Sequence, residues 1–197
     1  MNIKQLNEMP GYQDKDRVHL NNGINFELGK KLNLKTLDYK SVVPIEKPYS
    51  IIPFKHKFYC FDEDGTIVSV LESPRTDLVK EYFKGDVVHE ESIDTLEDYR
   101  GKGITTEFYY AILKGHLSIL SDYEHYRGTK KLWKNLSTKD DVIIKVFKNG
   151  KLIEEDYDLI KDDLNVWSSP IFLLLATTSK FINQLKIMEE LESYLIK

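Results

Sequence analysis

The sequence predicts a single domain of mixed α and β structure, an α/β (α+β) fold in which a mixed, mainly antiparallel sheet is flanked by helices. Three observations predict it. Strand-like and helix-like segments alternate along the chain, two hairpin turns lie between apolar runs, and a glycine-containing turn leads directly into a helix. With 197 residues, of which 41% are hydrophobic and 12% aromatic, the chain can bury a substantial core.

Residues 1–50 are expected to form an N-terminal arm of the same domain, and residues 51–178 its core. In the arm, turn signals and prolines interrupt the apolar residues, which fit a short helix or an irregular strand. In the core, residues 58–61 and 66–71 flank a turn at residues 62–65. Their β-branched and aromatic content predicts a β-hairpin.

Between this hairpin and the glycine-containing turn, residues 76–83 keep helical spacing and predict a short helix. Residues 87–96 then read as one strand with unusually many polar side chains, namely His89, Glu90, Glu91 and Asp94. The remaining core elements follow in order: a helix at 104–115, a strand at 116–121, a helix at 126–136, a second hairpin at 142–153 that turns at Asn149-Gly150, and strands at 166–167 and 171–177.

Residues 179–197 are predicted to form a C-terminal amphipathic helix. Its large apolar residues recur every three or four positions along one face: Phe181, Leu185, Met188, Leu191 and Leu195. We expect this stripe to be buried, either on the same domain, between the subunits of a homodimer, or against a host-protein partner.

Composition excludes several function classes. The net charge of −4 leaves no electrostatic footprint for nucleic-acid binding. Cys60 is the only cysteine, so intramolecular disulfide bonds are excluded, and the histidines lack metal-ligand spacing, so no metal is expected. The first twenty residues lack the apolar segment of a signal peptide, and the longest apolar run, at residues 171–176, is too short to cross a bilayer. These features predict a cytoplasmic protein without a membrane partner.

The most informative segment is the Arg-Gly-Lys-Gly turn at residues 100–103, which opens a helix. The first N–H groups of a helix have no partner within it, and the helix dipole adds partial positive charge at the same point. The two glycines let a bulky anion approach the main chain, and Arg100 and Lys102 add two cations. The turn therefore predicts a pyrophosphate-binding site. It lacks the Gly-Lys-Ser/Thr ending of Walker loops and the third glycine of the Rossmann fingerprint.

At these residues the sequence resembles the GNAT superfamily of N-acetyltransferases, whose Arg-x-x-Gly-x-Gly/Ala loop binds the pyrophosphate of coenzyme A. The match consists of Arg100, Gly103 and Thr105, although Thr105 stands where the family has a smaller residue. A downstream strand and a helix with Lys-Lys-Leu-Trp at residues 130–133 follow in the same order. They resemble a branch common in phage and prophage genomes, and the resemblance covers roughly residues 55–180.

The resemblance implies direct transfer of an acetyl group from acetyl-CoA, as co-substrate, to a primary amine of a small molecule or a protein. In this family the strand before the loop and the loop itself hold the donor, and a backbone N–H of the strand stabilises the charge that develops on the carbonyl oxygen. The residues that this implies for cofactor binding are Ile93, Thr95, Leu96, Arg100, Gly101, Lys102, Gly103, Ile104, Thr105 and Trp133.

Acetyl transfer also needs a base for the amine proton and an acid for the departing thiolate. Glu91 and Asp94 lie on opposite faces of a regular strand, and a bulge would re-aim either one. Both are therefore candidates for the base, with Glu91 the first choice. Trp133 stands where the family commonly has a tyrosine acid, and an indole N–H is no proton shuttle. Tyr126 or Tyr123 is the candidate acid in its place.

The residues at positions 105 and 133 also fit a function of another class. A non-catalytic GNAT-fold binding protein, encoded by a phage, could inhibit a host protein by surface contact. Such a protein would not need the tyrosine acid, and it would tolerate a narrower loop at Thr105.

Overall fold

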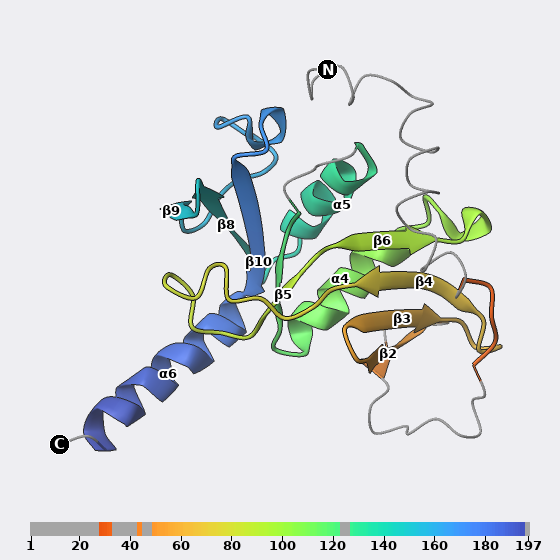
Figure 1. Cartoon of the computed structure of the whole chain (residues 1–197), viewed down its shortest axis with the longest axis horizontal. Helices are drawn as coiled ribbons and strands as arrows, with labels where there is room; N and C mark the ends of the chain where they lie inside the picture. Colours follow the sequence, from red (N-terminus) through yellow and green to blue (C-terminus); the bar gives the residue numbers. More distant parts are fainter. Residues whose placement is uncertain (1–27, 33–42, 45–48, 123–126, 196–197) are drawn as a thin grey trace.

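Two five-stranded sheets flanked by helices make up the part of the chain that the computed structural model describes, residues 28–32, 43–44, 49–122 and 127–195 (Figure 1). The first sheet has the order β1-β2-β3-β4-β6, with strands Val43–Pro44, Ser50–Phe54, Lys57–Phe61, Ile67–Glu72 and Ser92–Thr95. The second has the order β5-β7-β10-β8-β9, with strands Val87–His89, Ser118–Leu120, Phe172–Thr178, Val142–Lys148 and Lys151–Glu154. Helices α4, α5 and α6 span Ile104–Lys114, Arg127–Ser137 and Ser179–Leu195.

Both predicted hairpins are confirmed. Strands β3 and β4 pair in antiparallel fashion around the turn at residues 62–65, where Asp62 Oδ1 accepts the N–H groups of Asp64 (3.1 Å) and Thr66 (2.9 Å). Strands β8 and β9 meet at Asn149 and Gly150, whose φ values of 50° and 76° are those of a type I′ turn. All strand pairs are antiparallel except β5 with β7, which confirms the predicted mixed, mainly antiparallel α+β architecture.

The single strand predicted at residues 87–96 is wrong, because the segment divides between the two sheets. β5 runs parallel to β7 in the second sheet, whereas β6 runs antiparallel to β4 in the first. The division falls between two consecutive residues. The N–H of Glu90 bonds to the carbonyl of Leu120 (2.8 Å), and the N–H of Glu91 bonds to the carbonyl of Glu72 (3.0 Å).

Two further predictions are corrected. Residues 76–83 do not form a helix: residues 78–82 form a run of turns, and the N–H of Thr76 bonds to the carbonyl of Val87 (3.0 Å). Val79 and Phe83 are buried there, so their spacing reflects packing on the domain. The strand predicted at residues 166–167 is a 3₁₀-helix, Val166–Ser168, which follows a left-handed residue at Asn165.

The main core lies between the sheets and helices α4 and α5, and a smaller cluster covers the opposite face of the second sheet. Alternate residues of β10 divide between the two, because successive strand residues point to opposite faces. In the first sheet, Cys60 on β3 is fully buried in the main core. Burial, with a smaller contribution from the charge of Asp62, raises the pKa of its thiol to about 12.

Helix α6 begins on the second cluster and extends away from the rest of the domain (Figure 1). Of the predicted apolar stripe, Phe181 is buried, Leu185 is half-buried and Met188 is 56% exposed. The side chains of the last two members of the stripe, at positions 191 and 195, lie outside the described residues. The stripe is thus only partly covered by its own chain.

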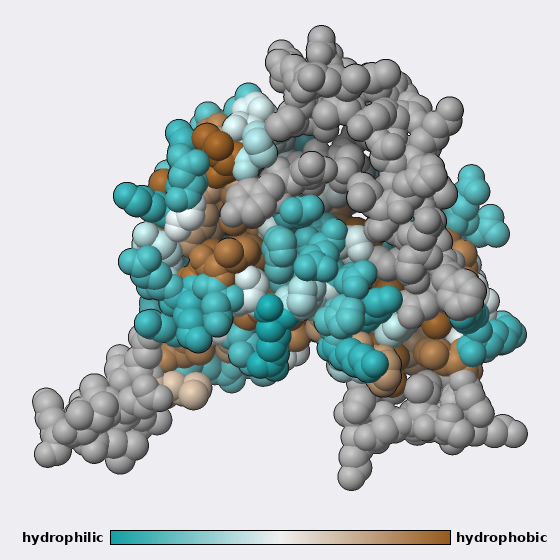
Figure 2. All heavy atoms as spheres, in the orientation of Figure 1, coloured by the Kyte–Doolittle hydropathy of each residue, from teal (hydrophilic) through white to brown (hydrophobic). Residues whose placement is uncertain are grey.

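On the face drawn in Figure 2, hydrophilic side chains occupy the centre and hydrophobic ones lie to either side. Of the predicted arm, residues 1–50, the structure describes 28–32, 43–44 and 49–50, and residues 43–44 form β1 of the first sheet. Residues 28–32 join the same sheet: the N–H of Gly29 bonds to the carbonyl of Ile67 (2.9 Å), and Leu28 and Leu32 pack beside Ile67. Within the described ranges, no helix combines the length and the hydropathy that a membrane span requires.

Candidate functional site

A pocket of about 210 Å³ opens where β6, the loop after it and the first turns of α4 and α5 come together. β6 contributes three consecutive residues, the loop two, α4 one and α5 three. They are Ile93, Asp94, Thr95, Arg100, Gly101, Thr105, Gly128, Thr129 and Leu132. Residues from the first turns of two helices therefore line this pocket, which places the positive end of each helix dipole near it.

The loop at residues 100–103 has the backbone that the two glycines predict. Gly101 and Gly103 have φ values of 74° and 79°, a left-handed conformation that other residues adopt only at a cost. A Cβ atom at either glycine would meet nothing within 4 Å, so the space above the loop is open. Gly103 is the N-cap of α4 and supplies no side-chain cap, which leaves the first N–H groups of the helix available to an anion.

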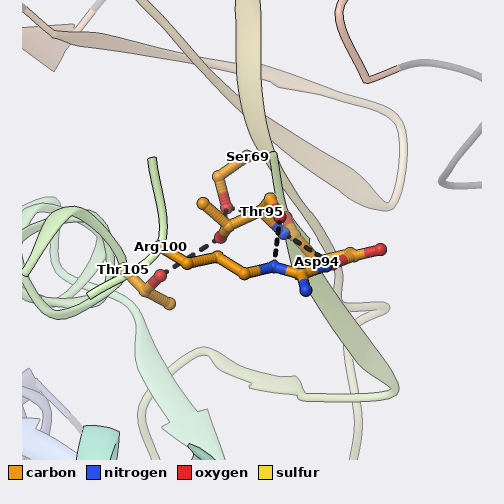
Figure 3. Close-up of polar contacts among 5 residues, drawn as sticks. All are labelled: Ser69, Asp94, Thr95, Arg100 and Thr105. Carbon is orange, nitrogen blue, oxygen red and sulfur yellow. Dashed lines mark hydrogen bonds and ion pairs between the residues drawn. The ribbon is translucent and has the colours of Figure 1, made fainter. Parts of the chain in front are cut away.

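One edge of β6 carries no partner strand in the described sheet, because β6 is the last strand in its order. The N–H of Leu96 bonds to the carbonyl of Val68 (2.9 Å), so the main-chain groups of Ile93 and Thr95 face the other edge. There the N–H of Thr95 bonds to Asp94 Oδ1 (2.8 Å), and its carbonyl accepts a bond from Arg100 Nε (2.8 Å) (Figure 3).

Asp94 and Arg100 form an ion pair across this edge, with 3.1 Å between Oδ1 and the guanidinium. The Asp94 side chain is 6% exposed, and that of Arg100 is 49% exposed. Because the guanidinium also bonds to the carbonyl of Thr95, Arg100 folds back over β6 instead of pointing away from the loop (Figure 3). Its positive charge is therefore largely committed to Asp94.

A chain of hydroxyl groups ties β4, β6 and α4 together below the pocket (Figure 3). Ser69 Oγ donates to the carbonyl of Asp94 (2.9 Å) and is 2.9 Å from Thr95 Oγ1. Thr95 Oγ1 is in turn 3.2 Å from Thr105 Oγ1. The hydroxyl of Thr105 thus attaches the first turn of α4 to β6, which a glycine or alanine at this position would not do.

The two predicted carboxylates are placed differently. Asp94 lines the pocket, whereas Glu91 is exposed and does not line it. The interruption between β5 and β6 instead buries Glu90, which is 4% exposed and whose Oε2 accepts the indole N–H of Trp133 at 3.2 Å. Trp133 is fully buried in the main core and does not line the pocket. Its indole N–H therefore contacts Glu90 inside the core and not a group in the pocket.

Six of the predicted site residues therefore meet at one pocket: Ile93, Asp94, Thr95, Arg100, Gly101 and Thr105. Four others lie beside it. Ile104 is buried in the core, Leu96 is half-buried, Gly103 forms the N-cap, and the exposed Lys102 places its Nζ 5.3 Å from the centre of the Tyr99 ring. The predicted acid Tyr126, and Tyr123, lie outside the described residues.

Three pocket residues on α5 were not predicted from the sequence, namely Gly128, Thr129 and Leu132. A small residue and a hydroxyl at the start of a predicted helix could have indicated them, because a second helix N-terminus strengthens an anion site. The burial of Glu90 was not predicted either. Within the described part of the chain, no group of three or more His, Cys, Asp or Glu side chains could hold a metal ion.

No family model and no curated protein sequence matches this chain. Among solved structures, the chain is similar to a protein assigned as a phosphinothricin N-acetyltransferase, with 20% sequence identity and a TM-score of 0.33 over 62% of this chain and 67% of that one. It is also similar to the N-terminal domain of a ribosomal-protein-alanine acetyltransferase from Clostridium acetobutylicum ATCC 824, with 13% identity and a TM-score of 0.31 over 72% of this chain and 98% of that one. The pocket itself is defined by this chain's own residues.

Proposed function

We propose that this protein is a GNAT-type N-acetyltransferase that moves an acetyl group from acetyl-CoA to a primary amine of a small molecule or a protein. The observation that carries the proposal is the pocket at the outer edge of β6. It combines a loop with two left-handed glycines, an uncapped helix N-terminus and a strand edge without a partner strand in the described sheet.

The pyrophosphate of the donor would lie over the loop. The N–H groups of residues 103–105 and the dipole of α4 would bind its oxygens, as helix N-termini bind other anions. Lys102 is exposed beside them and would add a charge. Arg100 would act mainly by holding the loop against β6, since its guanidinium is bonded to Asp94 and to the carbonyl of Thr95.

The thioester would lie along the free edge of β6, and a process of elimination indicates which N–H would meet its carbonyl oxygen. The N–H of Leu96 is used by Val68, and that of Thr95 is used by the carboxylate of Asp94. The N–H of Ile93 faces the open edge by strand alternation. We assign it the role of stabilising the negative charge that develops on this oxygen.

Asp94 is the carboxylate best placed to receive the amine proton, because it is the predicted carboxylate that lines the pocket. In the reaction, the neutral amine nitrogen forms a bond to the thioester carbon, the carbon–sulfur bond breaks, and the thiolate leaves with the electron pair. The base takes the proton that the nitrogen loses. Glu91 is exposed outside the pocket and would act only through a water molecule.

Replacement of Gly103 tests the donor site. Gly103→Asp places a negative charge where the pyrophosphate would lie, and we expect it to abolish coenzyme A binding in calorimetric titrations. Gly103→Asn is the matched control, since Asn has the same size and tolerates the left-handed backbone at φ 79° without the charge. Unchanged affinity in a folded Gly103→Asp protein would disprove the donor site, and so would equal losses in both variants.

A non-catalytic binding protein, encoded by a phage and acting on a host protein, is the second candidate. It is favoured by Trp133, which is buried against Glu90 where the resemblance implies a tyrosine acid. It is also favoured by the exposed apolar residues Ile187 and Met188 on α6, each 56% exposed, which could contact a partner or a second copy of the chain. Mass spectrometry of the purified protein separates the two candidates, because the enzyme would retain or bind coenzyme A and the inhibitor would not.

A further inference from the structure

The hydroxyl chain below the pocket has a fixed direction, which follows from counting protons. A carbonyl oxygen only accepts hydrogen bonds, so the 2.9 Å contact between Ser69 Oγ and the carbonyl of Asp94 uses the single hydroxyl proton of Ser69. The 2.9 Å contact between Ser69 Oγ and Thr95 Oγ1 must then use the proton of Thr95. The next contact, of 3.2 Å, must use the proton of Thr105.

Thr105 is the last member of this chain, and both Thr95 and Thr105 line the pocket. The only hydroxyl proton of Thr105 is committed to Thr95, so this hydroxyl can offer only lone pairs, and no donor, to a group bound in the pocket. Asp94, a buried carboxylate, stands nearby on the same wall. The pocket is therefore divided. The loop and the two helix N-termini favour negatively charged groups of a ligand. The wall formed by β6 and Thr105 instead favours hydrogen-bond donors.

We propose that Thr105 is a specificity-determining residue that accepts a hydrogen bond from an N–H group of the bound ligand. This inference rests on the proposed function, which supplies two N–H groups: the amides of the pantetheine arm and the amine of the acceptor. Both are donors of the same chemistry. A phosphate oxygen is excluded from this wall, because it would meet lone pairs and a carboxylate there.

Thr105→Val tests the proposal, since Val has nearly the shape of Thr and lacks the hydroxyl. We expect coenzyme A affinity to fall roughly 3- to 10-fold, the size of one neutral hydrogen bond. The nucleotide half of coenzyme A, 3′-phospho-ADP, has no pantetheine amide and should bind with unchanged affinity. Thr105→Ser retains the hydroxyl and should bind both compounds as the wild type does. Thr105→Ala provides a second hydroxyl-free variant in case the Val variant does not fold.

The same variants distinguish the two sources of the N–H group. Weaker coenzyme A binding with unchanged 3′-phospho-ADP binding identifies the pantetheine amide. Unchanged coenzyme A affinity with a KM for the amine raised by a similar factor, at constant kcat, identifies the acceptor. If neither affinity nor KM changes in folded Thr105→Val and Thr105→Ala proteins, the proposal is overturned.

A remote variant tests the proton order itself. Ser69 is fully buried on β4 and does not line the pocket, so Ser69→Ala changes none of the side chains that line it. Without Ser69 the hydroxyl of Thr95 is free to donate to Thr105, and Thr105 is no longer held as a pure acceptor. We expect Ser69→Ala to lower the affinity for coenzyme A less than Thr105→Val does. If Ser69→Ala does not lower it at all, the fixed proton order of the hydroxyl chain is overturned. Wild-type protein that fails to bind coenzyme A would refute the proposed function instead, a result distinct from these.

Discussion

β5 and β6 come from one polar segment, yet their edges are satisfied in different ways. β5 pairs with β7 on one edge, and on the other the N–H of His89 bonds to the carbonyl of Pro74 (2.8 Å). β6 pairs with β4 on one edge, and on the other its main chain is held by the side chains of Asp94 and Arg100. A bond to a side chain can be exchanged for a bond to a ligand without opening a sheet. The difference is what we expect if β5 maintains the fold and β6 meets the proposed ligand.

The largest expected effect comes from the carboxylate on β6. Asp94→Asn keeps an oxygen that can accept the N–H of Thr95 and removes the charge, and we expect acetyl transfer to slow by about 10²- to 10⁴-fold with coenzyme A affinity retained. Glu91→Gln, at an exposed position outside the pocket, is the matched control and should keep its rate. Steady-state kinetics decide the matter. If the Glu91→Gln protein is slow and the Asp94→Asn protein keeps its rate, the base does not lie on β6.

A second effect is expected at the junction of the two strands, where the buried Glu90 bonds to Trp133. Trp133→Ala removes a fully buried ring and should lower the free energy of unfolding by about 3–5 kcal/mol. Trp133→Phe keeps a ring but removes the N–H, and should cost about 1–3 kcal/mol. Denaturant titration measures both. If the Phe variant is as stable as the wild type, the indole bond to Glu90 does not secure the junction.

The smallest effect is expected on β5. Val88 is 3% exposed in the main core, and Val88→Ala removes two carbon atoms, which should cost about 1.6 kcal/mol of stability. Because no residue of β5 lines the pocket, coenzyme A affinity should not change. Thermal melting and calorimetry on the same sample test this contrast. An affinity loss in the folded Val88→Ala protein would show that both strands serve the site.

Local chemistry made much of this fold predictable. The turn residues Asp62 and Gly150 mark both hairpins, and positive φ at Gly101 and Gly103 follows from the need for a turn directly before a helix. The gathering of six predicted residues at one pocket was predictable for the same reason. A strand, a tight turn and a helix that are consecutive in sequence stay close together in space.

The missed features depend on contacts between residues far apart in the sequence. Strand alternation does not tell to which sheet a strand belongs, and the division of residues 87–96 is decided by bonds to Leu120 and Glu72. That division buries Glu90 and exposes Glu91, the first choice for the base, at the surface outside the pocket. The contribution of α5 to the pocket likewise depends on how α5 packs beside α4, which no local pattern encodes.

The rate at which the buried thiol of Cys60 is labelled can report how often the first sheet opens. A thiol reagent attacks the thiolate, and a pKa of about 12 leaves very little of it at neutral pH, while burial blocks access. Labelling of the single cysteine therefore requires the sheet around β3 to open, and its rate counts those openings. Measured with and without coenzyme A, the rate would report whether a ligand on the edge of β6 also makes the central strand of the same sheet open less often.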